Sequence, residues 1–436
     1  MSWIFDKVYR SLGTELTVPG LSTALSTPNQ VLYDGRYMWV SNGTNGLYVY
    51  ELWGATTNHE PAWDQLDLLT YPRYDSGINR KPRLVTVIKL TATAIQRVTC
   101  EPSLKEEGST EHTLASGEKA WYKSTARTGS ALNAYWLAQL GERLYVTNGS
   151  SFSEIYEFNV QTQNFTGTPV ANVAETFDGS PRAMRSNLCA SGARLWFVGG
   201  YTDTTDKQDP IRQRFYAYDP VASIKTIYDM TQRPTVDAIT QIADGKNGSV
   251  YLTLYNDVGV LKVNNLTGAQ TYVRFNAAPT AICSDESRRI WVNSFAGMQT
   301  LIDWDDSQVH NDWGTELTAR WFQVQPDNGN LLWFIRNDNM FVRYDLNTKQ
   351  QYELGTTEDW HFNDALLAGL KTGTLTYEQH YQKEDGTDVT VKPYFWGINA
   401  NALVGFRLDR YLRRPAYMKL TGNAAVSSGP EFYFGD

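Results

Sequence analysis

The chain has 436 residues, of which 42% are hydrophobic and 13% aromatic, and its formal net charge at pH 7 is −8. This mildly acidic balance disfavours a dominant role in binding the nucleic-acid backbone, although it leaves room for a local basic patch. No basic stretch followed by an apolar one opens the sequence, so we expect no signal peptide. No run reaches the roughly 18 apolar residues that span a bilayer, and we expect synthesis in a cytoplasm.

The first residues, 1–26, are expected to form an arm or a strand that closes the fold. From residue 27 to residue 360 one pattern recurs six times: an apolar strand with an aromatic anchor is followed by a short polar turn. The six anchors are Trp39, Tyr145, Trp196, Tyr251, Trp291 and Trp333. The six turns begin at Glu51, Asn159, Asp219, Asn264, Asp303 and Asp345. Five of the six turns begin 12 to 14 residues after their anchor, and the third begins 23 residues after it because of a polar insertion.

A long insertion at residues 54–130 interrupts the first unit. Within it, Arg83–Leu90 alternates in a way that predicts an outer strand, whereas the charged segment 105–113 predicts an exposed loop.

The fourth unit shows the expected strand pattern most clearly. An inner strand at 240–243, the anchored strand at 249–254, a third strand at 259–263 and an outer strand at 270–275 are separated by turns rich in Gly, Asn and Asp. These residues supply the positive backbone angles that tight hairpins require. The turns at Asn159, Asn264 and Asp345 also share an Asx-x-x-Thr form, in which the side chains can hydrogen-bond the backbone of their own turn.

Repetition of small β units at this period is typical of radial or linear stacking. The layout resembles the β-propeller superfamily, in which four-stranded blades surround a central axis. The resemblance covers residues 27 to 360 and reaches no named repeat class, since the WD pair, the kelch glycine pair and the sialidase Asp-box are missing. We therefore expect an all-β propeller with six recognisable blades and a seventh that could lie in the insertion or in the C-terminal region.

The last segment, 361–436, is expected to be a β extension with a docking tail. Ala365–Leu370 predicts a short helix, and segments 374–381 and 389–396 predict a hairpin whose tip is at residues 385–386. Two groups here are candidates for binding a partner. They are the basic cluster Arg407, Arg410, Arg413 and Arg414, and the aromatic tail Phe432, Tyr433 and Phe434. The cluster fits either an anionic partner or a salt-bridged strand face, and the tail fits either a neighbouring subunit or its own domain.

No sequence motif indicates catalysis, a cofactor or a metal site. The five histidines are not spaced as metal ligands, and the segment 303–307 lacks the glycine and glutamate of a calcium loop. The three scattered cysteines, Cys100, Cys189 and Cys283, are interpreted as reduced core residues. We expect no catalytic residue, no metal ligand and no cofactor.

These observations favour a non-enzymatic structural subunit of a large symmetric assembly. In its architecture and general style of sequence, the chain resembles the propeller-bearing tail proteins of tailed bacteriophages, of the nozzle or tail-tip type. That resemblance implies a virion location, contacts with other copies and other virion proteins, and host-surface contact through loops. Two alternatives stay open: a propeller enzyme, either a polysaccharide lyase or a glycosidase, with its site over the axis, and a propeller scaffold that binds peptides or proteins.

Overall fold

A computed structural model of the chain describes the fold from the N-terminal strand to the aromatic tail. The described residues are 7–9, 26–34, 37–51, 83–113, 119–177, 180–182, 184, 187–200, 213–232, 239–254, 257–275, 278–284, 290–294, 297–301, 309–310, 319–325, 331–336, 340–345, 348, 350–356, 372–375, 379–382, 388–391, 394–399, 402–407, 416–418 and 432–434. Within these ranges the regular structure is β-strand, apart from the short 3-10 helix η2 (Pro102–Leu104). The helix predicted at Ala365–Leu370 and the turn predicted at Asp303 lie outside the described residues.

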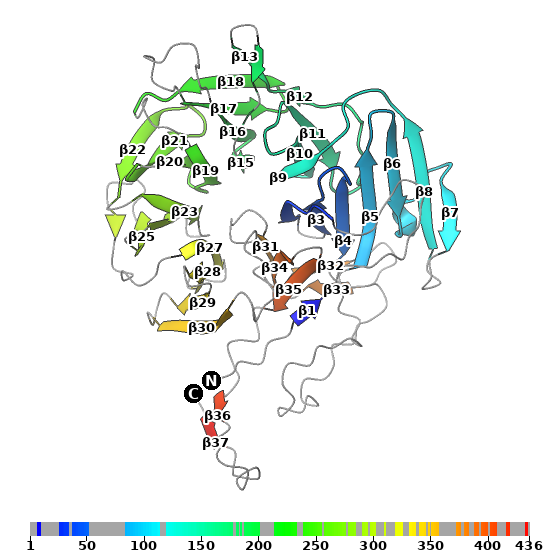
Figure 1. The fold of residues 1–436 in the computed structure, drawn as a ribbon. Coiled ribbons are helices and arrows are strands. Elements are labelled where there is room, and N and C mark those ends of the chain that lie inside the picture. The colour runs from blue at the N-terminus through cyan, green and yellow to red at the C-terminus, as the bar shows by residue number, and fades with distance from the viewer. Residues whose placement is uncertain are drawn as a thin grey trace.

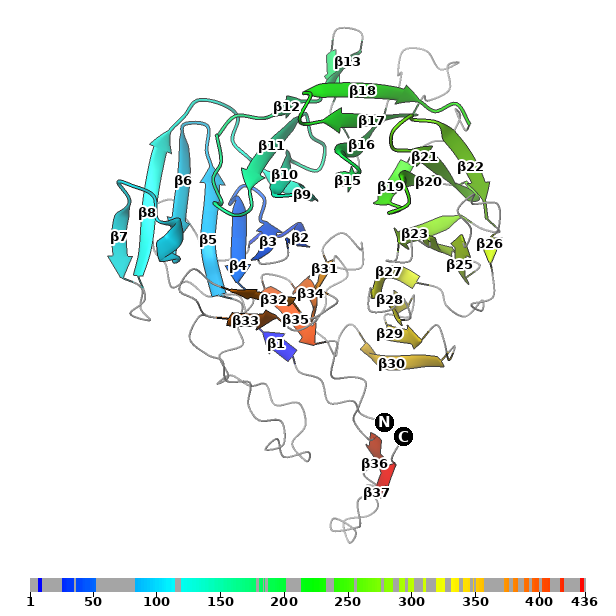
Figure 2. The ribbon, with the colours of Figure 1, turned by 180° about the vertical axis from the view of Figure 1, so that it is seen from behind.

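Seven of the antiparallel sheets that the described strands form are arranged in a ring around one axis (Figures 1 and 2), so the fold is the predicted β-propeller. From the innermost strand outward, blade 1 begins with β2 (Gln30–Tyr33), β3 (Tyr37–Ser41), β4 (Leu47–Glu51) and β5 (Arg83–Leu90), and blade 2 is β9 (Ala134–Leu140), β10 (Arg143–Asn148), β11 (Glu154–Asn159) and β12 (Ala171–Asn172). Blade 3 is β15 (Cys189–Ser191), β16 (Arg194–Gly200), β17 (Gln213–Asp219) and β18 (Ile224–Asp229), and blade 4 is β19 (Ile239–Asp244), β20 (Ser249–Leu254), β21 (Gly259–Asn264) and β22 (Gln270–Arg274). Blade 5 is β23 (Pro279–Ser284), β24 (Ile290–Ser294), β25 (Gly297–Leu301) and β26 (Val309–His310), and blade 6 is β27 (Ala319–Gln325), β28 (Leu331–Arg336), β29 (Met340–Asp345) and β30 (Gln350–Thr356). A small hairpin of β13 (Glu175–Phe177) and β14 (Ser180–Arg182) follows blade 2.

The seventh blade combines the two ends of the chain. Its strands are β31 (Thr372–Leu375), β34 (Tyr394–Asn399), β35 (Ala402–Arg407) and, on the outside, β1 (Lys7–Tyr9). The N-terminal strand pairs antiparallel with β35, with Lys7 opposite Phe406 and Tyr9 opposite Val404. The innermost strand β31 contacts β2 of blade 1, so the last blade meets the first. The ring therefore takes in strands on both sides of the boundaries expected at residues 26 and 360.

The predicted C-terminal hairpin is part of this blade. β32 (Gln379–Gln382) pairs with β33 (Asp388–Val391), which places the tip between residues 382 and 388, where the sequence put it. The base of the hairpin, β31 paired with β34, forms the first two strands of the blade. Trp396 lies at the centre of β34, the strand position that the anchors occupy in the other blades.

The six predicted anchors all lie on the second strand of their blades, and the described ones are buried. Trp39, Tyr145, Tyr251 and Trp291 are completely buried and Trp196 is 1% exposed, whereas the side chain of Trp333 lies outside the described part of the chain. Aromatic side chains of this size remove about 150–250 Å² each from water. They therefore supply much of the burial that holds small sheets together.

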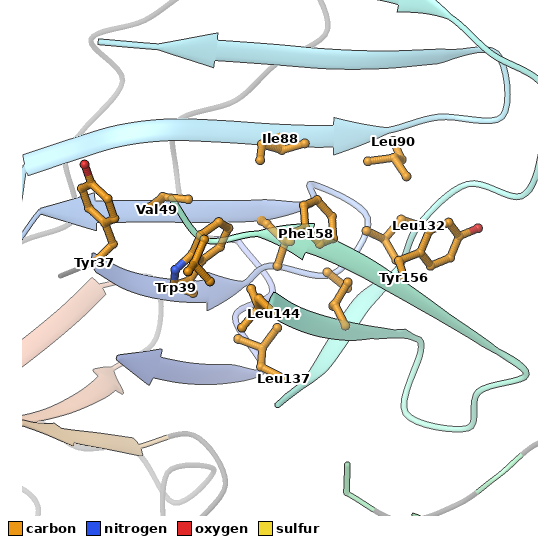
Figure 3. Close-up of a cluster of buried hydrophobic side chains, with 14 of the residues drawn as sticks. Tyr37, Trp39, Val49, Ile88, Leu90, Leu132, Leu137, Leu144, Tyr156 and Phe158 are labelled. Atoms are coloured by element: carbon orange, nitrogen blue, oxygen red, sulfur yellow. The ribbon is translucent and has the colours of Figure 1, made fainter. Parts of the chain in front are cut away.

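The described anchors of blades 1 to 4 pack against the next blade along the chain. Trp39 shares a cluster with Leu137 and Leu144 of blade 2 (Figure 3) and lies 6.4 Å from Phe158, measured between ring centroids. In the same way Tyr145 shares a cluster with strands of blade 3, Trp196 with strands of blade 4 and Tyr251 with strands of blade 5. The anchors are thus wedges between blades, which explains why the same residue type recurs once per unit.

The predicted Asx turns form as expected in blades 2 and 4. The Asn159 Oδ1 atom accepts hydrogen bonds from the backbone N–H groups of Gln161 and Thr162 at 3.0 and 2.8 Å. The Asn264 Oδ1 atom accepts the equivalent bonds from Leu266 and Thr267 at 3.0 and 2.9 Å. The turn chemistry read from the sequence is therefore confirmed by these contacts.

The insertion extends blade 1 beyond the ring. Arg83–Leu90 is the predicted outer strand, and the sheet continues with β6 (Ala94–Thr99), β8 (Lys119–Ala126) and β7 (Thr110–Thr113). We call these three strands the extension; Figure 1 shows them at the outside of blade 1. The segment predicted as an exposed loop, 105–113, is a loop up to residue 109 and then enters the edge strand β7, whose residues are mostly exposed.

Candidate functional site

A hollow of about 640 Å³ lies where the extension meets the turns of blades 1 and 2. The β2–β3 turn contributes Asp34, the β9–β10 turn contributes Glu142, and the β11–β12 turn contributes Gln161 and Asn164. A second wall is the loop around η2, which carries Lys105. We call this concave feature the rim hollow.

Arg97 of β6 holds the two walls together. Its side chain is 7% exposed, and its Nη1 atom donates to Glu106 Oε1 at 2.8 Å and to Asn164 Oδ1 at 2.7 Å. Its Nη2 atom donates to the carbonyl oxygen of Thr162 at 3.2 Å. One guanidinium therefore joins a strand of the extension, its connecting loop and a turn of blade 2, using the fork geometry of arginine.

Glu106 completes this cluster. Its Oε2 atom lies 3.1 Å from the Lys123 ammonium of β8, so the carboxylate bridges two cations. Burial favours the neutral acid, but hydrogen bonds and charge from Lys123 and Arg97 outweigh it, and the pKa of Glu106 lies below its ordinary value. Burial lowers the pKa of Arg97, against the favourable effect of Glu106. The pair remains ionised at neutral pH.

The blade side of the hollow is built from residues that also support the fold. The Asp34 carboxylate accepts hydrogen bonds from the Tyr37 backbone N–H at 2.7 Å and from the Trp39 indole N–H at 2.6 Å, so it positions an anchor. The Gln161 side-chain amide donates to Glu142 Oε1 at 2.7 Å and ties two turns of blade 2 together.

Three tyrosines and one cysteine in the described part of the chain have raised pKa values. Burial raises the pKa of Tyr50, Tyr145 and Cys189, and burial together with Glu154 raises that of Tyr156 to about 12. These groups are therefore neutral at pH 7. All three cysteines are free thiols, as the sequence predicted. Within the described residues, no group of three His, Cys, Asp or Glu side chains is placed to hold a metal ion.

The described partner-binding residues predicted from the sequence are not among the residues that line the rim hollow. Arg407 is the last residue of β35 and lies opposite Tyr394, whereas Arg410, Arg413 and Arg414 fall outside the described residues. The tail residues Phe432–Phe434 form β37, which pairs with β36 (Ala416–Met418). Figures 1 and 2 show this ribbon outside the ring of blades, so the tail pairs with its own chain, while docking on a neighbour stays a prediction.

The sequence prediction missed the rim hollow and its central residue. A local signal exists, because Arg97 interrupts Ala94–Thr99, a strand that otherwise carries apolar and uncharged side chains. A charged residue within a buried strand normally has a fixed partner. That partner could not be found from the sequence, because Glu106, Thr162 and Asn164 come from two different parts of the fold.

The comparisons with known proteins assign this chain to no protein family. No protein-family model matches the sequence, and no curated protein matches it. Among solved structures, virginiamycin B lyase from Staphylococcus aureus matches with a TM-score of 0.46 and 9% identity, over 92% of this chain and all of that one. The extracellular domain of a putative hybrid two-component system from B. thetaiotaomicron matches with a TM-score of 0.45 and 12% identity, over 97% of this chain and 42% of that one. Oligogalacturonate lyase matches with a TM-score of 0.43 and 8% identity, over 74% of this chain and 89% of that one. Likeness at this level carries no argument about activity.

In the described part of the chain, no helix has the length and hydropathy needed to cross a membrane.

Proposed function

We propose that the protein is a non-enzymatic structural subunit of a large symmetric assembly, with a bacteriophage tail of the nozzle or tail-tip type as its setting. Its partners are other copies of the chain and other proteins of the particle. The insertion at residues 54–130, which includes the extension, and the C-terminal region 360–436 make the subunit contacts, and exposed loops are available for contact with a host surface.

The observation that carries this proposal is the extension of blade 1. It continues the sheet by three strands beyond the ring and ends in the edge strand β7, where Thr110, Glu111 and Thr113 are exposed. A sheet edge presents unpaired backbone N–H and C=O groups, which can add a strand from a neighbouring chain. Among the described residues no strand pairs with the outer side of β7. A projecting edge of this kind supports protein contact better than chemistry near the axis.

The extension is also held rigidly. Arg97 fixes its first strand to blade 2, and the Lys123–Glu106 pair fixes its second strand to the same cluster. A rigid contact surface loses little conformational entropy when a partner binds, which favours association. This rigidity supports a role as an assembly surface.

Light scattering on the purified protein at micromolar concentration tests the proposal. We expect an oligomer, and we expect the variant that lacks residues 421–436 to associate more weakly. Glu111→Lys removes an exposed ion pair with Lys119 at 2.7 Å on the extension, and it should also weaken association with little effect on the fold. Asp229→Lys is the matched control, because it breaks an equivalent exposed pair with Arg214 at 2.7 Å on β18.

The proposal fails if the wild-type protein is a monomer over this concentration range. It also fails if neither the truncation nor Glu111→Lys changes the oligomer more than Asp229→Lys does.

A further inference from the structure

The rim hollow contains polar groups that the fold leaves unused. The Gln161 amide occupies one oxygen of Glu142, and within the described residues the other Glu142 oxygen and the Gln161 side-chain oxygen accept no hydrogen bond. Both residues are exposed, and both line the hollow. Asn164 uses its oxygen for Arg97, and among the described contacts its amide nitrogen donates to no acceptor. From this arrangement we infer that the hollow binds an uncharged, hydroxyl-rich ligand of disaccharide size.

The hollow offers both acceptors and donors. The acceptors lie on blade 2, where Gln139 of β9 also donates its amide to the Gly141 carbonyl oxygen at 2.9 Å and keeps its own oxygen for another donor. The donors are the Asn164 amide and, on the loop around η2, the Lys105 ammonium. A hydroxyl group donates one hydrogen bond and accepts two, so a ligand carrying several hydroxyls can satisfy both walls at once.

The charges in the hollow favour an uncharged ligand. Asp34 keeps its negative charge, because the Tyr37 and Trp39 N–H groups that it accepts from are neutral. The acids Asp34, Glu106 and Glu142 are matched in number by the bases Arg97, Lys105 and Lys123, the last of which pairs with Glu106, so the charges around the hollow sum to zero. A strongly anionic or cationic ligand would lose its hydration without a net opposite charge to compensate for it.

Size and apolar lining agree with this chemistry. A volume of about 640 Å³ falls within the range of small-molecule sites, about 300–1,000 Å³. Leu104 and Val160 both line the hollow and provide apolar contact for the C–H groups of a sugar ring. The walls are joined by Arg97 before any ligand arrives, so binding orders few protein groups.

The experiment is saturation-transfer NMR on the 436-residue chain with maltose, cellobiose and lactose at millimolar concentration. We expect at least one of these neutral disaccharides to bind. The Glu142→Ala/Gln161→Ala variant should bind it about tenfold more weakly, the size expected for the loss of two hydrogen bonds. Leu266→Ala is the matched control, because Leu266 occupies the Gln161 position in the Asx turn of blade 4 and is 76% exposed.

If the double variant does not fold, Lys105→Gln replaces it, because this exposed side chain makes no described hydrogen bond and its described contact is with the Trp121 ring, 5.7 Å from the Lys105 ammonium to the ring centroid; a loss of several-fold is expected. The inference is overturned if none of the three disaccharides binds the wild-type protein, or if the double variant binds as tightly as the Leu266→Ala control. It is also overturned if digalacturonate or the dipeptide Lys-Lys binds more tightly than the neutral sugars. None of these results depends on the oligomeric state, so they are separate from the test of assembly.

Discussion

Asn187 and the backbone of Ile242 form a closed pair of hydrogen bonds that joins blade 3 to blade 4. The Asn187 amide donates to the Ile242 carbonyl oxygen at 2.9 Å, and the Ile242 N–H donates to Asn187 Oδ1 at 3.0 Å. Both bonds are buried, and Asn187 is 7% exposed. The side chain therefore acts as an additional backbone unit between two sheets that share no strand pairing.

Replacing Asn187 should lower the stability of the ring by more than is usual for such a small side chain. Asn187→Ala leaves a buried N–H and a buried C=O of Ile242 without partners, and we expect the free energy of unfolding to fall by about 2–4 kcal/mol. Urea denaturation followed by tryptophan fluorescence measures this change. Asn172→Ala, at an exposed site on β12, is the control, and equal effects of the two variants would contradict the bridging role.

Two anchors with the same residue type should differ in their response to Trp→Phe. The Trp39 indole donates to Asp34 at 2.6 Å, whereas the buried Trp196 indole N–H has no partner. Trp39→Phe breaks a charge-assisted hydrogen bond, while Trp196→Phe removes an unsatisfied polar group. We expect Trp39→Phe to cost about 1–3 kcal/mol more than Trp196→Phe.

Thermal and denaturant unfolding of both variants checks this difference. The two substitutions remove the same atoms from equally buried sites, so each serves as the control for the other. An equal loss of stability would show that the Asp34 contact contributes nothing.

Loss of the Arg97 side chain should destabilise the extension locally without unfolding the ring of blades. Arg97→Met keeps an apolar stem but removes the contacts to Glu106, Asn164 and Thr162, and it leaves the Glu106 charge with Lys123 alone. We expect amide hydrogen exchange in β6 and β8 to become faster, with little change in β19–β22 of blade 4. Lys262→Met on β21 is the control for the loss of a positive charge. Uniform exchange changes over both regions would contradict a local role.

The attachment of the extension should weaken in acid. The folded-state pKa of Glu106 lies below its ordinary value of 4.5, because Lys123 and Arg97 together outweigh the effect of burial. The stabilisation by this carboxylate is therefore fully present above pH 4.5 and is lost as the pH falls through the lower, folded-state pKa.

Glu106→Gln tests this pH dependence. At pH 7 the variant should show faster hydrogen exchange in β6 and β8 than the wild type, and the difference should shrink as the pH is lowered below 4.5. Exchange rates corrected for intrinsic pH effects at pH 7, 5 and 3 give the measurement. A difference that stays constant over this range would rule out Glu106 as the titrating group.

The sequence by itself determined the repeating unit. Anchors such as Trp196 and turns such as the one at Asn264 are local features: a strand alternates over a few residues, and an Asx turn is closed by bonds within four residues. For this reason the strands of the fourth blade are predicted to within one residue at every end. The wedge role of the anchors follows from the same periodicity, because a large aromatic once per unit must be buried against something.

Only the tertiary structure decided how the ring closes and where the rim hollow lies. In blade 7, residues 376–393 separate β31 from β34 and the outer strand comes from residues 7–9, so Trp396 has no regular spacing to reveal it. The hollow depends on Arg97 meeting Asn164 across 67 positions of the sequence. Such pairings are selected by the global packing of the sheets, in which many weak contacts act together, and no local pattern encodes them.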